Sequence, residues 1–159
     1  MNRLNRKVEY ALMALRYMCS KVPGELTTAK EVVDQTGCPF DATARVMQLM
    51  AQKGILKSEQ GSHGGYAIVR DLSKTSFYDL IEMILGPLGI VKCVHAVNMC
   101  ELEGTCNIRS PLAELNARLI EFYKNLTVYE ILKLKDRPAP QSREVLVPGI
   151  GVESATRGQ

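Results

Sequence analysis

The feature that most constrains the fold is a glycine-rich turn between two short strands. Residues 55–58 and 66–69 have the composition of strands, and the turn between them reads QGSHGG over residues 60–65. Glycine has no Cβ atom, so the three glycines let the tip of this hairpin approach another backbone closely. Taken alone, the pattern also fits an ordinary solvated hairpin, and its interpretation depends on what precedes it.

Two short helices are predicted immediately before the hairpin. Thr28-x-x-Glu31 has capping-box spacing, which predicts a helix of about eight residues that ends at the Gly-Cys-Pro sequence of residues 37–39. A second short helix with a buried apolar stripe covers residues 39–53. Two short helices joined by a tight turn have the dimensions of a helix-turn-helix, and a hairpin directly after them makes a winged helix.

Most of the remaining chain is also predicted to be helical. Apolar residues at helical spacing predict further helices over residues 6–21, 76–85, 110–126 and 127–134. The fold class is therefore mainly α with a small β-hairpin. The predicted organisation is a winged helix-turn-helix domain (1–86), a cysteine-rich loop (87–110), a long helix with a short terminal helix (111–135) and a disordered tail (136–159).

The helix that begins at Ser110-Pro111 carries an apolar seam outside the N-terminal core. The seam consists of Leu112, Leu115, Leu119, Phe122 and Leu126. A seam of four turns predicts packing against a second copy of the chain, and hence a homodimer. The alternative is that the helix folds back onto its own domain.

Composition excludes several classes of protein. The chain has a net charge of +4 over residues 1–70 and −1 over residues 71–159, so the positive field belongs to the N-terminal half. It lacks an apolar run of roughly 18 residues and a signal peptide, which predicts a cytoplasmic protein with no membrane partner. It also lacks a Ser/His/Asp arrangement and a phosphate-binding loop, so we expect no enzyme.

Residues 93–106, CVHAVNMCELEGTC, place Cys93, Cys100 and Cys106 on one short irregular segment. Thiolates ligate iron–sulfur clusters, and the wide gaps suit a cluster better than the tight C-x₂₋₄-C knuckle of a structural zinc site. Spacing alone leaves three alternatives open: a cluster, zinc, or thiols that bind no metal. Cys19 and Cys38 lie singly in patterned segments and are interpreted as core residues.

Four motifs together resemble those of one known family. They are the opening RLNRKVEYAL, the wing KGILKSEQGSHGGY, the three-cysteine loop and NLTVYEIL near residue 130. In this order they are similar to the Rrf-two family of winged-helix transcriptional regulators, the IscR/NsrR-like iron–sulfur sensors. The resemblance covers residues 1–134 and implies a homodimeric regulator, usually a repressor, whose DNA affinity depends on a cluster in the cysteine loop.

Two departures from the family pattern bear on the fourth ligand. The first cysteine gap is six residues instead of five, and Arg109 stands where one branch has a histidine, although a guanidinium cannot ligate iron. In the nitric-oxide-sensing branch an acid of the first helix reaches the partner subunit's cluster, and Glu9 stands at that position. The resemblance therefore implies Cys93, Cys100, Cys106 and Glu9 as ligands of a 4Fe–4S cluster, with 2Fe–2S as the alternative. His95 is the other candidate for the fourth ligand.

The DNA contacts are predicted on the second helix of the helix-turn-helix and on the wing. Arg45 could read guanine and Gln48 adenine, while Lys57 and Arg70 would meet phosphates. Asp41 is expected mainly to cap the helix. The predicted set is Thr28, Asp41, Thr43, Ala44, Arg45, Gln48, Lys57, Ser62, His63, Gly64 and Arg70. A two-fold dimer would favour an imperfect palindromic operator. The competing hypothesis is a cluster-carrying electron-transfer or scaffold protein, against which the basic N-terminal half argues.

Overall fold

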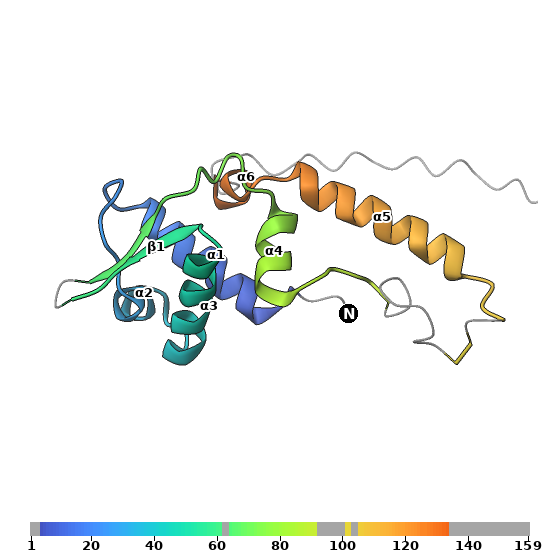
Figure 1. Ribbon diagram of the computed structural model, residues 1–159, viewed down its shortest axis with the longest axis horizontal. Helices are drawn as coiled ribbons and strands as arrows, with labels where there is room; N and C mark the ends of the chain where they lie inside the picture. The colour runs from blue at the N-terminus through green and yellow to red at the C-terminus, as the bar shows by residue number, and fades with distance from the viewer. Residues whose placement is uncertain (1–3, 62–63, 92–100, 103–104, 134–159) are drawn as a thin grey trace, which may run out of the picture.

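The computed structural model describes residues 4–61, 64–91, 101–102 and 105–133. The elements follow one another as α1 (Arg6–Cys19), α2 (Ala29–Thr36), α3 (Phe40–Gln52), β1 (Leu56–Glu59), β2 (Gly65–Ile68), α4 (Phe77–Leu85), α5 (Arg109–Asn125) and α6 (Val128–Lys133) (Figure 1). The predicted mainly helical fold with one small hairpin is confirmed.

Helix α1 lies at the centre of the winged domain. Its apolar stripe is buried, with Val8, Ala11, Ala14 and Leu15 fully inaccessible to solvent. Helices α2, α3, α4 and α6 and strand β2 all contact it, and α3 and α4 contact each other. The shared core also contains Val32, Val46, Met47, Met50, Ile55, Leu80 and Val128. A stripe at 3.6-residue spacing on one helix thus becomes the surface on which the other elements assemble.

Helix α1 is shorter than the sequence predicted. It ends at Cys19 instead of continuing to Lys21, and Val22 is 71% exposed. Cys38 is buried as expected, but Cys19 is exposed, so its interpretation as a core residue is wrong. The chain leaves the helix at Ser20, so Val22 no longer continues the apolar stripe, and Cys19 is exposed as the last helical residue.

The hairpin pairs antiparallel, with Leu56 opposite Ile68 and Glu59 opposite Gly65. Both strands are shifted by one residue from the predicted ranges. The backbone N–H of Ile55 donates to the Met50 carbonyl at 2.9 Å, and this bond draws Ile55 into the end of α3. Ile55 is fully buried there, so the residue that looked like the first of the strand is a core residue beneath the wing.

Helix α5 extends away from the winged domain, and α6 turns back onto α1 (Figure 1). The chain at the C-terminal end of α5 is held to the start of α4 by two backbone hydrogen bonds. Phe77 N–H donates to Leu126 O at 2.7 Å, and Val128 N–H donates to Thr75 O at 2.9 Å. The rings of Phe77 and Tyr123 meet edge to face at 5.3 Å. The predicted seam of α5 is therefore divided: Leu112, Leu119 and Leu126 are half-buried, whereas Leu115 and Phe122 are exposed.

Several predictions lie outside the described residues. They concern Ser62 and His63 at the wing tip, Cys93, His95 and Cys100 in the cysteine segment, and the tail from residue 136. Among the helices that are described, none combines the length and the apolar character needed to cross a membrane.

Candidate nucleic-acid interface and cysteine segment

The turn between α2 and α3 depends on Gly37. This residue adopts a left-handed conformation with φ of 70°, and its N–H donates to the Val33 carbonyl at 2.8 Å. A glycine takes this conformation without the steric cost that a Cβ would add. The chain then turns through Cys38 and Pro39 into α3, giving the helix-turn-helix that the sequence predicted.

A reciprocal capping box opens α2, as predicted. The Thr28 hydroxyl accepts from the Glu31 N–H at 3.2 Å, and the Glu31 carboxylate accepts from the Thr28 N–H at 2.6 Å. Lys21 Nζ lies 3.2 Å from the same carboxylate. The bond from the Thr28 backbone N–H is the largest cause that holds the pKa of Glu31 below its ordinary value. Thr28 is exposed at the start of α2, so its predicted DNA contact would have to coexist with its capping role.

The outer face of α3 presents Asp41, Arg45 and Gln48, all exposed, with Ala44 half-buried between them. Thr43 is different: it is fully buried, and its hydroxyl donates to the Pro39 carbonyl at 2.9 Å. The prediction that Thr43 faces DNA is therefore wrong, because a hydroxyl bonded back into the first turn cannot reach a base edge.

Asp41 does not cap α3. The residue at the N-cap is Pro39, which makes no side-chain capping bond. Asp41 instead lies in the first turn, where its carboxylate faces the positive end of the helix dipole. The predicted capping role is corrected to an electrostatic one.

The wing is joined to the segment before α2 by backbone pairing. Thr27 N–H donates to the Tyr66 carbonyl at 2.9 Å, and Tyr66 N–H donates back to the Thr27 carbonyl at 2.9 Å. A Cβ on Gly65 would lie 3.0 Å from the Thr27 carbonyl oxygen, and a Cβ on Gly64 would clash with the Glu59 carbonyl oxygen. The glycines thus permit close backbone approach within the domain itself, a contact that sequence reasoning missed because Thr27 lies outside the strand patterns.

Basic side chains flank the wing. Lys57 on β1 and Arg70 after β2 are both exposed, and Lys57 Nζ lies 3.4 Å from the Glu59 carboxylate. An exposed ion pair of this kind contributes at most about 1 kcal/mol. Lys57 can therefore exchange Glu59 for a phosphate at small cost.

Two of the four predicted cluster ligands are described. Cys106 is half-buried and forms no disulfide, and it lies just before α5. Glu9 lies in the first turn of α1, with its side chain 36% exposed and 3.3 Å from Arg6. A free thiol and a carboxylate held only by an exposed ion pair have the chemistry and access that a cluster requires.

One chain does not bring these two ligands together. The start of α5 lies well away from the start of α1 in Figure 1. Within the described ranges no three His, Cys, Asp or Glu side chains gather to hold a metal ion, and two of the three predicted thiolates fall outside those ranges.

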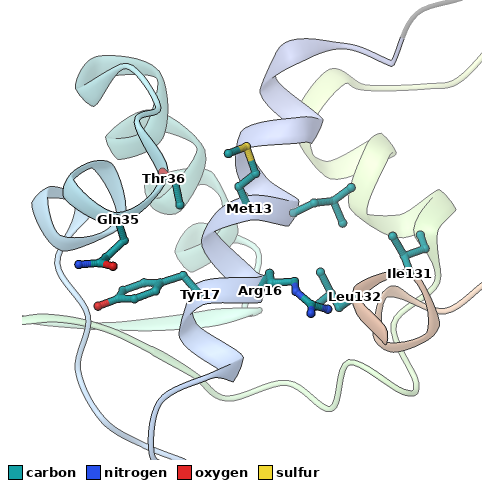
Figure 2. A pocket seen from close by; sticks show the side chains of 8 residues that line it. Met13, Arg16, Tyr17, Gln35, Thr36, Ile131 and Leu132 are labelled. Carbon is teal, nitrogen blue, oxygen red and sulfur yellow. The ribbon is translucent and has the colours of Figure 1, made fainter. Parts of the chain in front are cut away.

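A groove of about 780 Å³ opens elsewhere, between α1, the end of α2 and α6 (Figure 2). Its lining is mainly apolar, with Leu12, Met13 and Leu132 on its walls and Arg16 as its charged residue. None of the predicted cluster or DNA contacts lies in it. No local pattern predicts this groove, since its walls come from three helices that are separated along the chain.

Comparison with known proteins agrees with the fold. The Rrf2 family profile, described as that of an iron-dependent transcriptional regulator, matches residues 4–134. A relative from Aquifex aeolicus (strain VF5), which carries the name of an HTH-type transcriptional regulator, is 23% identical over 132 residues. That match covers 82% of this chain and 91% of the relative.

Solved structures show the same fold at low identity. CymR, the global cysteine regulator of B. subtilis, has a TM-score of 0.65 at 17% identity, covering 84% of this chain and 98% of that chain. T. potens IscR has a TM-score of 0.59 at 17% identity, covering 89% of this chain and 93% of that chain.

The helix-turn-helix, its wing and these matches define the class as a winged-helix transcriptional regulator. The chain belongs to the Rrf2 (Rrf-two) family, as the four motifs of its sequence predicted.

The capping box predicts a pH-dependent stability. Because the folded protein lowers the pKa of Glu31, this carboxylate stabilises the fold above its usual pKa of 4.5, and the contribution is lost as the pH falls through the lowered value. Chemical denaturation should show that the protein loses more stability on acidification than its Glu31→Gln variant. Asp34→Asn, an exposed change on the same helix, is the matched control. Parallel pH curves for the protein and Glu31→Gln would contradict the assignment.

Proposed function

We propose that this protein is a homodimeric DNA-binding regulator, a repressor, whose affinity for its operator is set by an iron–sulfur cluster. The observation that carries the proposal is the combination of an exposed α3 face and wing with a free Cys106 thiol, three residues before α5, and with exposed Leu115 and Phe122 on that helix. Membership of the Rrf2 family, described as iron-dependent, supports it.

The DNA-binding part follows from the geometry of the helix-turn-helix. Helix α3 would enter the major groove with Arg45 and Gln48 facing base edges, and the wing would contact the adjacent backbone through Lys57 and Arg70. These four side chains are exposed. Asp41, in the first turn, would exclude phosphate from the start of α3 and leave that position to a base.

The dimer would form through α5. Leu115 is 54% exposed and Phe122 is 58% exposed, and they lie seven residues apart on one face. Large apolar side chains in such a row favour a second helix over water. A two-fold pair of α5 helices would place two winged domains on an imperfect palindromic operator.

The cluster would be held by Cys93, Cys100 and Cys106 of one subunit and a carboxylate of the other. Glu9 suits the second role, because within one chain the start of α1 lies well away from the start of α5 (Figure 1) and a carboxylate there is free to reach another subunit. When bound, the cluster supplies iron and sulfide that react with oxygen or nitric oxide, and it is lost when iron is scarce. The Glu9 carboxylate is a harder ligand than thiolate and would bind its iron more weakly.

A second candidate is a regulator that senses redox state through its thiols or a bound zinc ion. Cys106 is free and half-buried, and the solved structures with this fold include the oxidised form of Staphylococcus aureus CymR, with a TM-score of 0.62 at 14% identity. Anaerobic purification with an absorption spectrum and with iron, sulfide and zinc analysis separates the two. A colourless protein with stoichiometric zinc, or with no metal, would favour the second candidate.

Each cysteine of the segment should be needed for the cluster. Cys100→Ala should abolish or destabilise the cluster and change DNA affinity, because removing one thiolate leaves an iron without a ligand. Iron content and mobility shift measure this. Cys38→Ala, which alters a buried thiol outside the segment, is the control and should keep its iron. Full iron content in Cys100→Ala would refute the ligand assignment.

Glu9 should control the reactivity of the cluster more than its assembly. Glu9→Ala, purified without oxygen, should show a changed absorption spectrum and a changed rate of reaction with nitric oxide or oxygen. Arg6→Ala removes the ion-pair partner but keeps the carboxylate, and it is the matched control. An unchanged spectrum and rate in Glu9→Ala would bring His95 forward as the fourth ligand.

Mutations should distinguish the side chain that reads a base from the side chain that binds phosphate. Arg45→Ala should relax sequence preference at one position by about 1–3 kcal/mol, the worth of a bidentate contact to guanine. Lys57→Ala should weaken binding to all sequences alike and reduce the salt dependence of binding. Titrations of operator and random DNA at several salt concentrations test both. Equal losses on the two DNAs for Arg45→Ala would contradict its reading role.

A further inference from the structure

Asn116 is the buried residue of α5. It is 4% exposed, while the rest of this fully described helix is exposed or half-exposed. Its Oδ1 accepts a hydrogen bond from the backbone N–H of Ile90 at 3.0 Å. A polar side chain is costly to bury unless it is hydrogen-bonded, so this contact explains why an asparagine occupies the inward position of an amphipathic helix.

The contact attaches the start of the cysteine segment to α5. Ile90 lies three residues before Cys93, and Arg109, the first residue of α5, lies three residues after Cys106. The two residues that flank segment 91–108 are therefore both attached to α5, Ile90 through Asn116 and Arg109 as the first residue of the helix. Seven residues of helix separate these two attachment points, a rise of about 10 Å.

Asn116 lies in the middle of α5, so the attachment of Ile90 can affect how this helix packs. The C-terminal end of α5 is held to the winged domain through Phe77, whose N–H donates to the Leu126 carbonyl at 2.7 Å. Leu115, on the exposed seam, is the neighbour of Asn116. A change in the loop that breaks the Ile90 bond would therefore act on the middle of α5, beside the side chains that would meet a second copy.

We propose that Asn116 is a positioning residue, which holds the first arm of the cysteine segment against α5 and so links the state of that segment to the dimer helix. This inference rests on the proposed function, in which the segment holds a cluster. Losing the bond would release Ile90 from α5, and the entropy of a connecting segment grows only slowly with its length. The main effect of Asn116 is therefore on the orientation of the ligands.

Three variants at this position separate the hydrogen bond from packing. Asn116→Leu keeps the size of the side chain and removes the acceptor, Asn116→Ala removes the acceptor without any risk of a clash, and Asn116→Asp keeps an acceptor oxygen. Asn125→Leu makes the same change at an exposed position of the same helix. Far-UV circular dichroism and dimer mass check that each variant folds and assembles.

Two measurements then test the role. In the cluster-free protein, hydrogen exchange of the Ile90 amide should be faster in Asn116→Leu and Asn116→Ala and close to normal in Asn116→Asp. In the cluster-bound protein without oxygen, transfer of iron to a chelator should be about 10- to 100-fold faster in the first two variants, as for partners that orient metal ligands. Asn116→Asp should restore most of the retention, and Asn125→Leu should change neither quantity.

The outcomes distinguish this inference from the function on which it rests. A protein that never binds iron refutes the proposed function, and the Ile90 amide exchange still decides whether Asn116 holds the loop. Unchanged exchange in Asn116→Leu and Asn116→Ala would overturn the inference. Equally fast iron loss in Asn116→Asp and Asn116→Leu would also overturn it, because loss without rescue is a packing effect and not the loss of an acceptor.

Discussion

The burial of one stripe of α1 is the constraint on which the rest of the structure depends. Val8, Ala11, Ala14 and Leu15 are fully inaccessible, and α2, α3, α4, α6 and β2 all contact this helix. Fully burying a large apolar side chain such as Leu15 contributes roughly 1.5–3 kcal/mol. Without α1 the short helices α2 and α6 could not persist, since helices of six to eight residues are unstable alone. The helix-turn-helix is therefore supported by α1, which packs against α2 and α3.

The wing depends on a different interaction, the backbone pairing between Thr27 and Tyr66. A two-stranded hairpin alone is marginally stable in water. This pairing joins the hairpin to the chain that enters α2, so the wing and the helix-turn-helix are connected by backbone hydrogen bonds. Gly65 permits the approach, because a side chain there would meet the Thr27 carbonyl. The glycines of the wing thus have a role in the fold that is independent of any DNA contact.

Helix α5 differs from the other elements because it is only partly covered. Its end packs against α4 through Tyr123, its middle is held by Asn116, and Leu115 and Phe122 face solvent. A helix with few buried apolar contacts has a low local stability, so its packing can change when a neighbouring segment changes. In a regulator, such a helix can link cluster binding to DNA binding. The cysteine segment lies just before its N-terminal end, and its C-terminal end is attached to the winged domain.

The sequence by itself determined the elements whose signals are local. The capping boxes at Thr28-x-x-Glu31 and Thr127-x-x-Glu130, the left-handed Gly37 and the apolar stripe of α1 depend on neighbours within one or two turns. These local signals were enough for the order of helices and the winged helix, and the family was predicted from the resemblance of four motifs. The ligand set and most of the DNA contacts are still predictions from the resemblance and from position.

Only the tertiary structure decided which residues of a pattern face inward and which distant segments meet. Thr43 has the polarity of a DNA contact, yet its hydroxyl bonds to Pro39 and it is buried. Cys19 continues an apolar stripe, yet it is exposed on the last turn of α1. The Thr27–Tyr66 and Ile90–Asn116 contacts join residues 39 and 26 positions apart, and no local pattern encodes them. Periodicity specifies a face of a helix, whereas the partner of that face is fixed only when the whole chain has packed.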